Sequence, residues 1–127
     1  MVRRNIIFLL LFCALLGGVL LEQNYIDSTL FEMEEQIEGL QSDIKDENLS
    51  NSSKDIASIK SYWHDKEIVF SLFVDYKDID QIGKQIELID EHLTNVDFEL
   101  AAVECGLLLH IVKTYHSTVS FDWQNII

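Results

Sequence analysis

The sequence predicts an all-α protein with an N-terminal transmembrane helix, an antiparallel four-helix bundle built from two helical hairpins, and a short C-terminal tail. Three observations predict this fold. Apolar residues recur every three or four positions in four stretches, proline is absent from all 127 residues, and an unbroken apolar run stands near the N-terminus. Spacing of three and four places apolar side chains on one helix face. A chain without proline permits long helices, and this length suits one small domain.

The apolar run covers residues 6–21 and ends at Glu22. At about 1.5 Å per residue it spans about 24 Å, which is short of a bilayer core of about 30 Å, so flanking residues must extend it. A cleaved signal peptide is the alternative, but the end of the run lacks paired small residues at cleavage-site spacing. We therefore expect an uncleaved anchor over residues 6–24, with the lipid bilayer as a partner.

Basic residues predict the orientation of this anchor. Arg3 and Arg4 precede the apolar run, and the next basic residue after it is Lys45. Because positive charges are retained on the cytoplasmic side, residues 1–5 are expected in the cytoplasm. The helical domain over residues 25–127 is then expected outside it, at the cell membrane.

Four apolar seams, each a row of apolar residues at spacings of three and four, predict the helices of this domain. In chain order the seams are Ile26, Leu30, Met33, Ile37, Leu40 and Ile44; Ile56, Ile59, Trp63, Phe70 and Phe73; Ile79, Ile82, Ile86, Ile89 and Leu93; and Phe98, Ala101, Cys105, Leu108, Val112 and Tyr115. Short loops between the seams favour antiparallel neighbours. A closed bundle and a repeat-like stack of two hairpins both explain the pattern.

Polar stretches mark the expected connections. Residues 48–53, NLSNSS, are expected to form a loop that ends in a capping arrangement at Ser52 and Asp55. Residues 75–78, DYKD, are expected to form a tight connection, and Asp97 is the expected N-cap of the last helix. The tail over residues 117–127 is expected to fold back and hide Phe121, Trp123, Ile126 and Ile127.

The charge balance limits the classes of partner. The formal net charge is −13, from 22 acidic and nine basic residues. Phosphates would be repelled, so no nucleic acid is expected as a partner. The acidic surface keeps a small domain soluble, and it also suits a basic partner or divalent cations. The two cysteines, Cys13 and Cys105, lie in separate apolar patterns and predict no disulfide scaffold.

The sequence shows no arrangement typical of catalysis or metal binding. His64 and Glu67 have the spacing of half a metal site, but such pairs are common on solvated helix faces. The acidic stretch from Asp75 to Asp80 lacks the glutamate that completes a calcium loop. We therefore predict no catalytic, cofactor-binding or metal-binding residues and no cofactor.

A candidate interaction surface is predicted instead, from aromatic and acidic side chains in the second and third helical stretches. Its residues are Tyr62, Trp63, Tyr76, Asp78 and Asp80. Aromatic side chains are common in contact patches, although Trp63 also fits a core position. Asp78 and Asp80 also fit a role in helix capping.

The chain resembles a family of small, uncharacterised, membrane-anchored helical proteins of Gram-positive endospore-forming bacteria, a domain of unknown function. The resemblance rests on Trp63, the stretch FVDYKDIDQI over residues 73–82, Asp97 with Ala101, and the terminal residues 125–127. The family is expected often to have histidine where this chain has Tyr76, and this departure argues against a proton-transfer or metal role at that position. The resemblance implies an extracytoplasmic helical module beside an integral membrane protein.

The expected function is therefore a non-enzymatic protein–protein interaction or accessory module with a protein partner. The alternative is a sensor or binding protein for a small ligand or a divalent cation.

Overall fold

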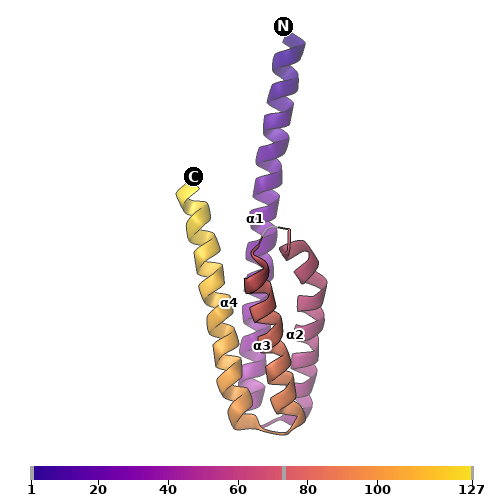
Figure 1. Cartoon of the computed structure of the whole chain (residues 1–127), viewed down its shortest axis with the longest axis vertical. Helices are drawn as coiled ribbons and strands as arrows, with labels where there is room; N and C mark the ends of the chain where they lie inside the picture. The colour runs from indigo at the N-terminus through magenta and orange to yellow at the C-terminus, as the bar shows by residue number, and fades with distance from the viewer. Residues whose placement is uncertain (1, 73, 127) are drawn as a thin grey trace.

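The computed structural model describes residues 2–72 and 74–126, and its regular elements there are α-helices. In chain order they are α1 (Val2–Lys45), α2 (Leu49–Phe70), α3 (Tyr76–Thr94) and α4 (Phe98–Ile126) (Figure 1). α1 packs against α2 and α4, and α3 packs against the same two helices. This ring of contacts makes a closed four-helix bundle, which decides between the two arrangements that the seams left open.

The predicted seams form the core of the bundle. Every residue of the first seam is at most 5 % exposed and every residue of the third at most 6 %. The second and fourth seams are also buried, except that Phe98 and Tyr115 are only partly covered and Phe73 lies outside the described residues. Burying one Leu or Ile side chain contributes about 1.5–3 kcal/mol, so these rows stabilise the bundle.

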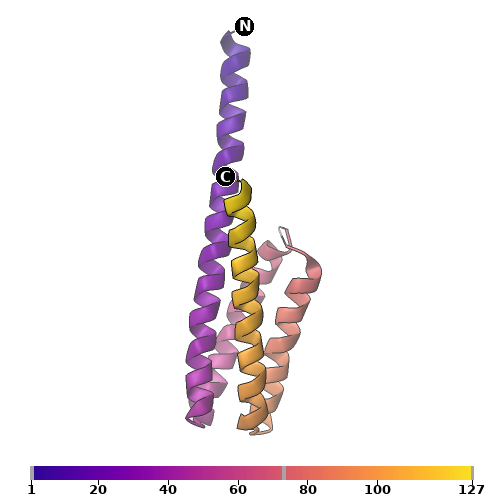
Figure 2. The same ribbon diagram turned by 90° about the vertical axis from the view of Figure 1, so that its left-hand side faces the viewer.

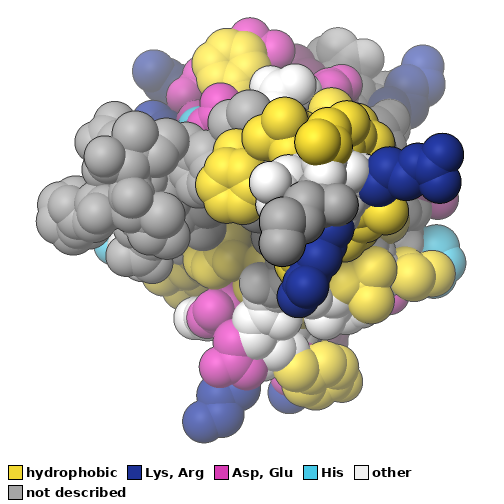
Figure 3. All heavy atoms as spheres, turned by 90° about the horizontal axis from the view of Figure 1, so that it is seen from above, with side chains coloured by type: hydrophobic (Ala, Val, Ile, Leu, Met, Phe, Trp, Pro, Cys, Tyr) yellow, Lys and Arg dark blue, Asp and Glu magenta, His cyan; other side chains and the backbone are white. Residues whose placement is uncertain are grey.

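The N-terminal part of α1 projects beyond the bundle as a single continuous helix (Figures 1 and 2). The C-terminal part of α1 carries the first seam, whereas residues 6–12 in its N-terminal part are each between 50 % and 64 % exposed. Seven successive exposed positions cover every face of a helix. Viewed from this end, hydrophobic side chains gather around the projecting helix (Figure 3).

The structure does not support the transmembrane anchor that was predicted over residues 6–24, and the expected fold is corrected here. Among the described residues, no helix combines the length and the apolar character needed to cross a membrane. The prediction had assumed that flanking residues extend an apolar run of about 24 Å to the about 30 Å of a bilayer core. The cytoplasmic and extracytoplasmic sides assigned from Arg3 and Arg4 were derived from that anchor and stay predictions.

The first connection is shorter than predicted, because α2 begins at Leu49 and includes most of residues 48–53. Asn48 is the N-cap, and its Oδ1 accepts a hydrogen bond of 3.0 Å from the Asn51 backbone N–H. The chain turns between the two helices at Glu47, whose φ of 53° lies in the left-handed region. An asparagine cap satisfies a free N–H at the helix start as well as the expected serine would.

The remaining ends of the helices also differ in part from the predictions. Asp75 is the N-cap of α3, so residues 76–78 of the predicted connection are helical. Asp97 caps α4 as predicted, and its Oδ1 accepts a hydrogen bond of 3.1 Å from the Leu100 N–H. α4 then continues to Ile126 in place of the short tail, because nothing in residues 117–126 breaks a helix. The predicted packing of the tail side chains lies outside the side chains that the structure describes.

Candidate functional site

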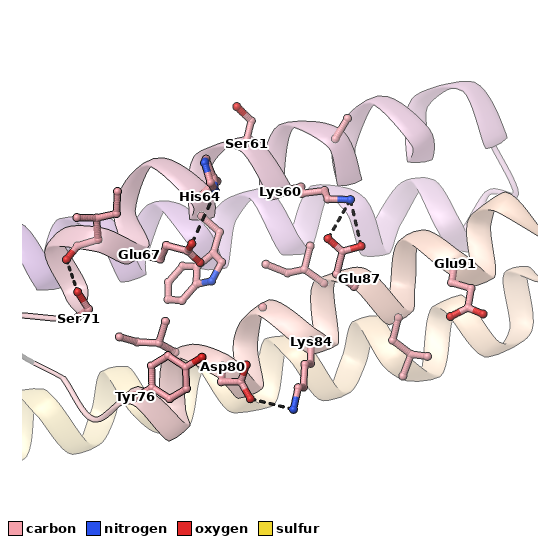
Figure 4. Close-up of a pocket in the computed structure, with 17 residues that line it drawn as sticks. Lys60, Ser61, His64, Glu67, Ser71, Tyr76, Asp80, Lys84, Glu87 and Glu91 are labelled. Atoms are coloured by element: carbon pink, nitrogen blue, oxygen red, sulfur yellow. Dashed lines mark hydrogen bonds and ion pairs between the residues drawn. The ribbon is translucent and has the colours of Figure 1, made fainter.

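A groove runs between α2 and α3 on the outside of the bundle (Figure 4). It has a volume of about 930 Å³, and apolar side chains from both helices line it, among them Trp63, Ile79 and Ile86. These three side chains are buried, at 3 %, 6 % and 1 % exposed. Charged and polar side chains form the rim above this apolar floor. We call this site the α2–α3 groove.

Trp63 is the largest side chain of the floor, and its polar atom has no partner. The indole ring stands edge-on to Phe70, with ring centroids 5.6 Å apart. Its Nε1 is buried and finds no hydrogen-bond acceptor in the part of the chain that the structure describes. A buried donor left without an acceptor costs about 1–3 kcal/mol. The groove therefore contains one donor that an oxygen atom from outside could satisfy.

Gly83 on α3 faces this indole. A Cβ atom placed on Gly83 would lie 3.6 Å from Trp63 Nε1, which is ordinary van der Waals distance. A glycine inside a helix lowers its stability by about 1 kcal/mol relative to alanine, so an interior glycine usually has a packing or functional reason. Here the missing side chain leaves space directly beside the indole nitrogen.

Ion pairs connect the rim of the groove. Lys60 on α2 reaches across to α3, where its Nζ lies 2.9 Å from Glu87 Oε1 and 3.4 Å from Asp90 Oδ2. The hydrogen bond to Glu87 raises the pKa of Lys60 above its ordinary value. Lys84 pairs with Asp80 within α3 at 2.9 Å. These side chains are largely exposed, so water and salt screen the ion pairs and they contribute little to stability.

Three of the five predicted interaction residues line the α2–α3 groove. Trp63 forms its floor, while Tyr76 and Asp80 stand on the α3 side of its rim (Figure 4). Tyr76 is 72 % exposed. The prediction that these residues bind a partner stays a prediction, but the fold does place them together.

Tyr62 lies on a different face of α2, toward α1. Its hydroxyl donates a hydrogen bond of 3.4 Å to Glu32 Oε2. Burial raises the pKa of Tyr62, and the charge of Glu32 adds to the effect. Lys66 Nζ lies 5.2 Å from the centroid of the Tyr25 ring and 5.3 Å from that of Tyr62. Its ammonium group thus caps the edge of the core between two aromatic rings.

Asp78 also lies away from the groove, on the side of α3 that faces α4. Burial raises the pKa of Tyr115 on α4 to about 12, and the charge of Asp78 adds to this rise. Asp78 therefore belongs to the α3–α4 interface, and the predicted surface is divided between two sides of α3.

Sequence reasoning missed Gly83 and the lysines of the rim. Gly83 stands between Ile82 and Ile86 of the third seam, and a lone glycine inside a helical pattern was the one signal that pointed to it. The Lys60 bridge joins residues 27 and 30 positions apart. Such a pair is visible only once α2 and α3 lie side by side.

A second polar cluster, also missed, joins α4 to α1. His116 Nε2 lies 2.6 Å from Asp27 Oδ1, and its Nδ1 lies 3.2 Å from Glu34 Oε1. Burial opposes the charged imidazolium, but the hydrogen bonds to Asp27 and Glu34 outweigh it, so the pKa of His116 is raised above its ordinary value. The cluster is an interhelical clamp.

The His64–Glu67 pair, weighed as half of a metal site, is a long and exposed contact. Its Nδ1–Oε1 distance is 3.7 Å and the histidine side chain is 77 % exposed. Across the described residues, no group of three or more His, Cys, Asp or Glu side chains is arranged to hold a metal ion.

Two serines line the groove, Ser61 and Ser71, and the Ser71 hydroxyl donates to the backbone oxygen of Ile68. The apolar floor of the groove, with the unpartnered Nε1–H of Trp63, suits the binding of another molecule.

The fold and the groove together define a four-helix bundle protein with a candidate binding site between two neighbouring helices. The model of the family described as "Domain of unknown function (DUF4363)" matches residues 20–126, and the chain belongs to this family. The match includes Trp63, residues 73–82, Asp97 with Ala101, and residues 125 and 126, on which the resemblance was based, and it ends before Ile127. Searches of the curated proteins and of the solved structures each found no match.

Proposed function

We propose that this protein is a non-enzymatic interaction module that binds a protein partner at the α2–α3 groove. The observation that carries the proposal is an uncovered apolar rim at one end of the groove. Ile68 and Tyr76 line the groove there and are 69 % and 72 % exposed, and the buried indole of Trp63 lines the same groove. Large apolar side chains gathered on one surface mark interaction sites, and Tyr and Trp are the residues enriched at their energetic centres.

The projecting end of α1 supports the same class of function. Its residues 6–12 expose large apolar side chains over every face of the helix. Exposed apolar surface of this extent is normally covered by another molecule. The bundle itself has a closed core, so this surface adds nothing to its internal packing.

The test is affinity purification of the tagged, full-length chain from the cells that express it naturally. We expect a stoichiometric protein partner that stays bound through size-exclusion chromatography. Recovery of the chain alone, as a monodisperse monomer, would contradict the proposal.

A matched pair of variants locates the contact. Tyr76→Ser removes an exposed aromatic side chain from the groove, and Phe31→Ser removes one from α1 that is 55 % exposed. Interface truncations at such centres cost about 2 kcal/mol or more, so Tyr76→Ser is expected to weaken the partner's retention by at least tenfold. Phe31→Ser is expected to leave it unchanged. Equal loss in both variants would show that the groove is not the contact.

The alternative function, binding of a small ligand, is favoured by the groove's volume of about 930 Å³ with a free donor in its floor. Pockets of roughly 300–1,000 Å³ hold small molecules. Thermal unfolding against a panel of metabolites and divalent cations tests this alternative. A shift produced by a metabolite and abolished by Gly83→Ala would support it, and no shift across the panel would exclude it.

A further inference from the structure

The indole nitrogen of Trp63 sets the first requirement for whatever enters the α2–α3 groove. An indole N–H can only donate, and a buried Trp usually finds an acceptor for it. Trp63 is 3 % exposed, and its Nε1 has none within the described residues. The space left by Gly83 lies beside this atom, since a Cβ there would be 3.6 Å away. The occupant must therefore bring an oxygen acceptor to this position.

The charges around the groove select the kind of acceptor. Four acidic residues and two lysines line it: Glu67, Asp80, Glu87, Glu91, Lys60 and Lys84. Both lysines already contact acids, Lys60 with Glu87 and Lys84 with Asp80. The surroundings are therefore acidic, as is the whole chain at −13. A carboxylate or phosphate would be repelled, whereas a neutral carbonyl oxygen beside a positive charge is favoured.

We propose that the α2–α3 groove binds a polypeptide segment that carries apolar and basic side chains. A backbone carbonyl of this segment accepts the Trp63 Nε1–H in the space beside Gly83. Its apolar side chains cover the floor and the exposed rim at Ile68 and Tyr76. Its basic side chains lie against Glu67 and Glu91, the two acids of the groove that do not pair with its lysines. This inference rests on the proposed function, because it names the chemistry of the partner at the same site.

A peptide meets all of these requirements at once. Its backbone places a neutral carbonyl at every residue, with side chains of chosen type on both sides. Because Nε1 is covered in the free protein, the segment reaches it only after the rim moves aside. Two side chains of the groove, Tyr76 and Lys84, are 72 % and 78 % exposed, and rotamer changes of such side chains are common on binding.

The experiment follows the indole N–H of Trp63 in the full-length chain. The sequence has two tryptophans, so Trp123→Phe leaves Trp63 as the single indole in nitrogen-15 spectra and in fluorescence. The probes are two acetylated and amidated pentapeptides, one alternating leucine with lysine and the other alternating leucine with glutamate. We expect the lysine peptide to shift the indole proton downfield with saturation, as a new hydrogen bond does, and the glutamate peptide to leave it unchanged.

Two glycine variants provide the matched comparison. Gly83→Ala puts a methyl group into the space beside Nε1, and Gly39→Ala adds one on α1 where no atom lies within 4 Å. Both replace a helical glycine by a better helix former, so both are expected to fold and to melt a few degrees higher. Gly83→Ala should weaken binding of the lysine peptide at least tenfold, and Gly39→Ala should leave it unchanged.

The outcomes separate this inference from the proposed function. If neither peptide perturbs the indole, if both bind equally, or if the two glycine variants bind alike, the assigned chemistry is wrong. A natural partner that still co-purifies with the Gly83→Ala variant would refute the Trp63 contact while leaving the interaction function in place. Loss of that partner in Gly83→Ala, with retention in Gly39→Ala, supports both.

Discussion

Nε2 of His116 on α4 lies 2.6 Å from Oδ1 of Asp27 on α1, and this contact joins the last helix of the bundle to the first. Glu34 approaches the other ring nitrogen from the same helix, α1. The imidazole is 19 % exposed, so its ion pair is shielded from solvent more than the pairs at the rim of the groove.

This clamp predicts a pH dependence of stability. The folded state raises the pKa of His116 above its ordinary value, so it favours the protonated ring. The stabilisation is fully present below the ordinary pKa of about 6.5 and is lost as the pH rises through the folded-state pKa. Denaturant unfolding of the wild type should show this loss, and His116→Gln should remove it. Equal pH profiles for both proteins above pH 6.5 would contradict the clamp.

A second pH effect is expected from Asp55 on α2. Burial raises the pKa of Asp55 from 3.8 to about 6, and the nearby carboxyl group of Asp43 on α1 adds to the rise. A raised carboxyl pKa means that stability is lost as the pH rises from about 4 through 6. Asp55→Asn should therefore raise the Tm by a few degrees at pH 7 and change it little at pH 4. The exposed Asp65→Asn on the same helix is the control and should show no such difference.

The two cysteines should differ in their reaction with thiol reagents. Cys105 is completely buried, and burial raises its pKa to about 12, whereas Cys13 is exposed. Because the thiolate is the reactive form, Ellman's reagent should modify one thiol in the folded protein and two in denaturant. The Cys13→Ser variant should show almost no reaction until it unfolds. Rapid labelling of that folded variant would show that the helices around Cys105 open readily.

Core and surface positions of the bundle should respond differently to truncation. Ile89 on α3 is 0 % exposed, and Leu100 on α4 is 46 % exposed. Ile89→Ala should lower the free energy of unfolding by about 2–5 kcal/mol, because it removes buried methyl groups and leaves a cavity. Leu100→Ala should change it by no more than about 0.5 kcal/mol. Urea unfolding curves of both variants measure the difference.

The helices were the part of the fold that could be predicted from local pattern. Ile37 and Ile89 belong to seams that are buried throughout, and Asp97 caps α4 as expected. The ends of helices were less predictable, because Asn48 and Ser52 are both good caps and only the packed chain shows which one is used. The transmembrane helix was wrong because hydropathy alone was extended past the end of a short apolar run.

The candidate site was predictable only in part, for a related reason. Trp63, Tyr76 and Asp80 could be chosen as aromatic and acidic side chains, but their common groove depends on how α2 packs against α3. The same periodicity that placed Trp63 in a seam could not reveal that its nitrogen lacks an acceptor. Tyr62 and Asp78 were chosen on the same grounds and lie on other faces.

The sequence by itself determined the number of bundle helices, the face that each one buries and the acidic character of the surface. These properties follow from the spacing and type of residues along the chain, and local physics is enough to read them. The tertiary structure decided the closed ring of helices, the clamp at His116 and the position of Gly83 beside Trp63. Each of these depends on residues far apart in the chain, which become neighbours only when the helices pack.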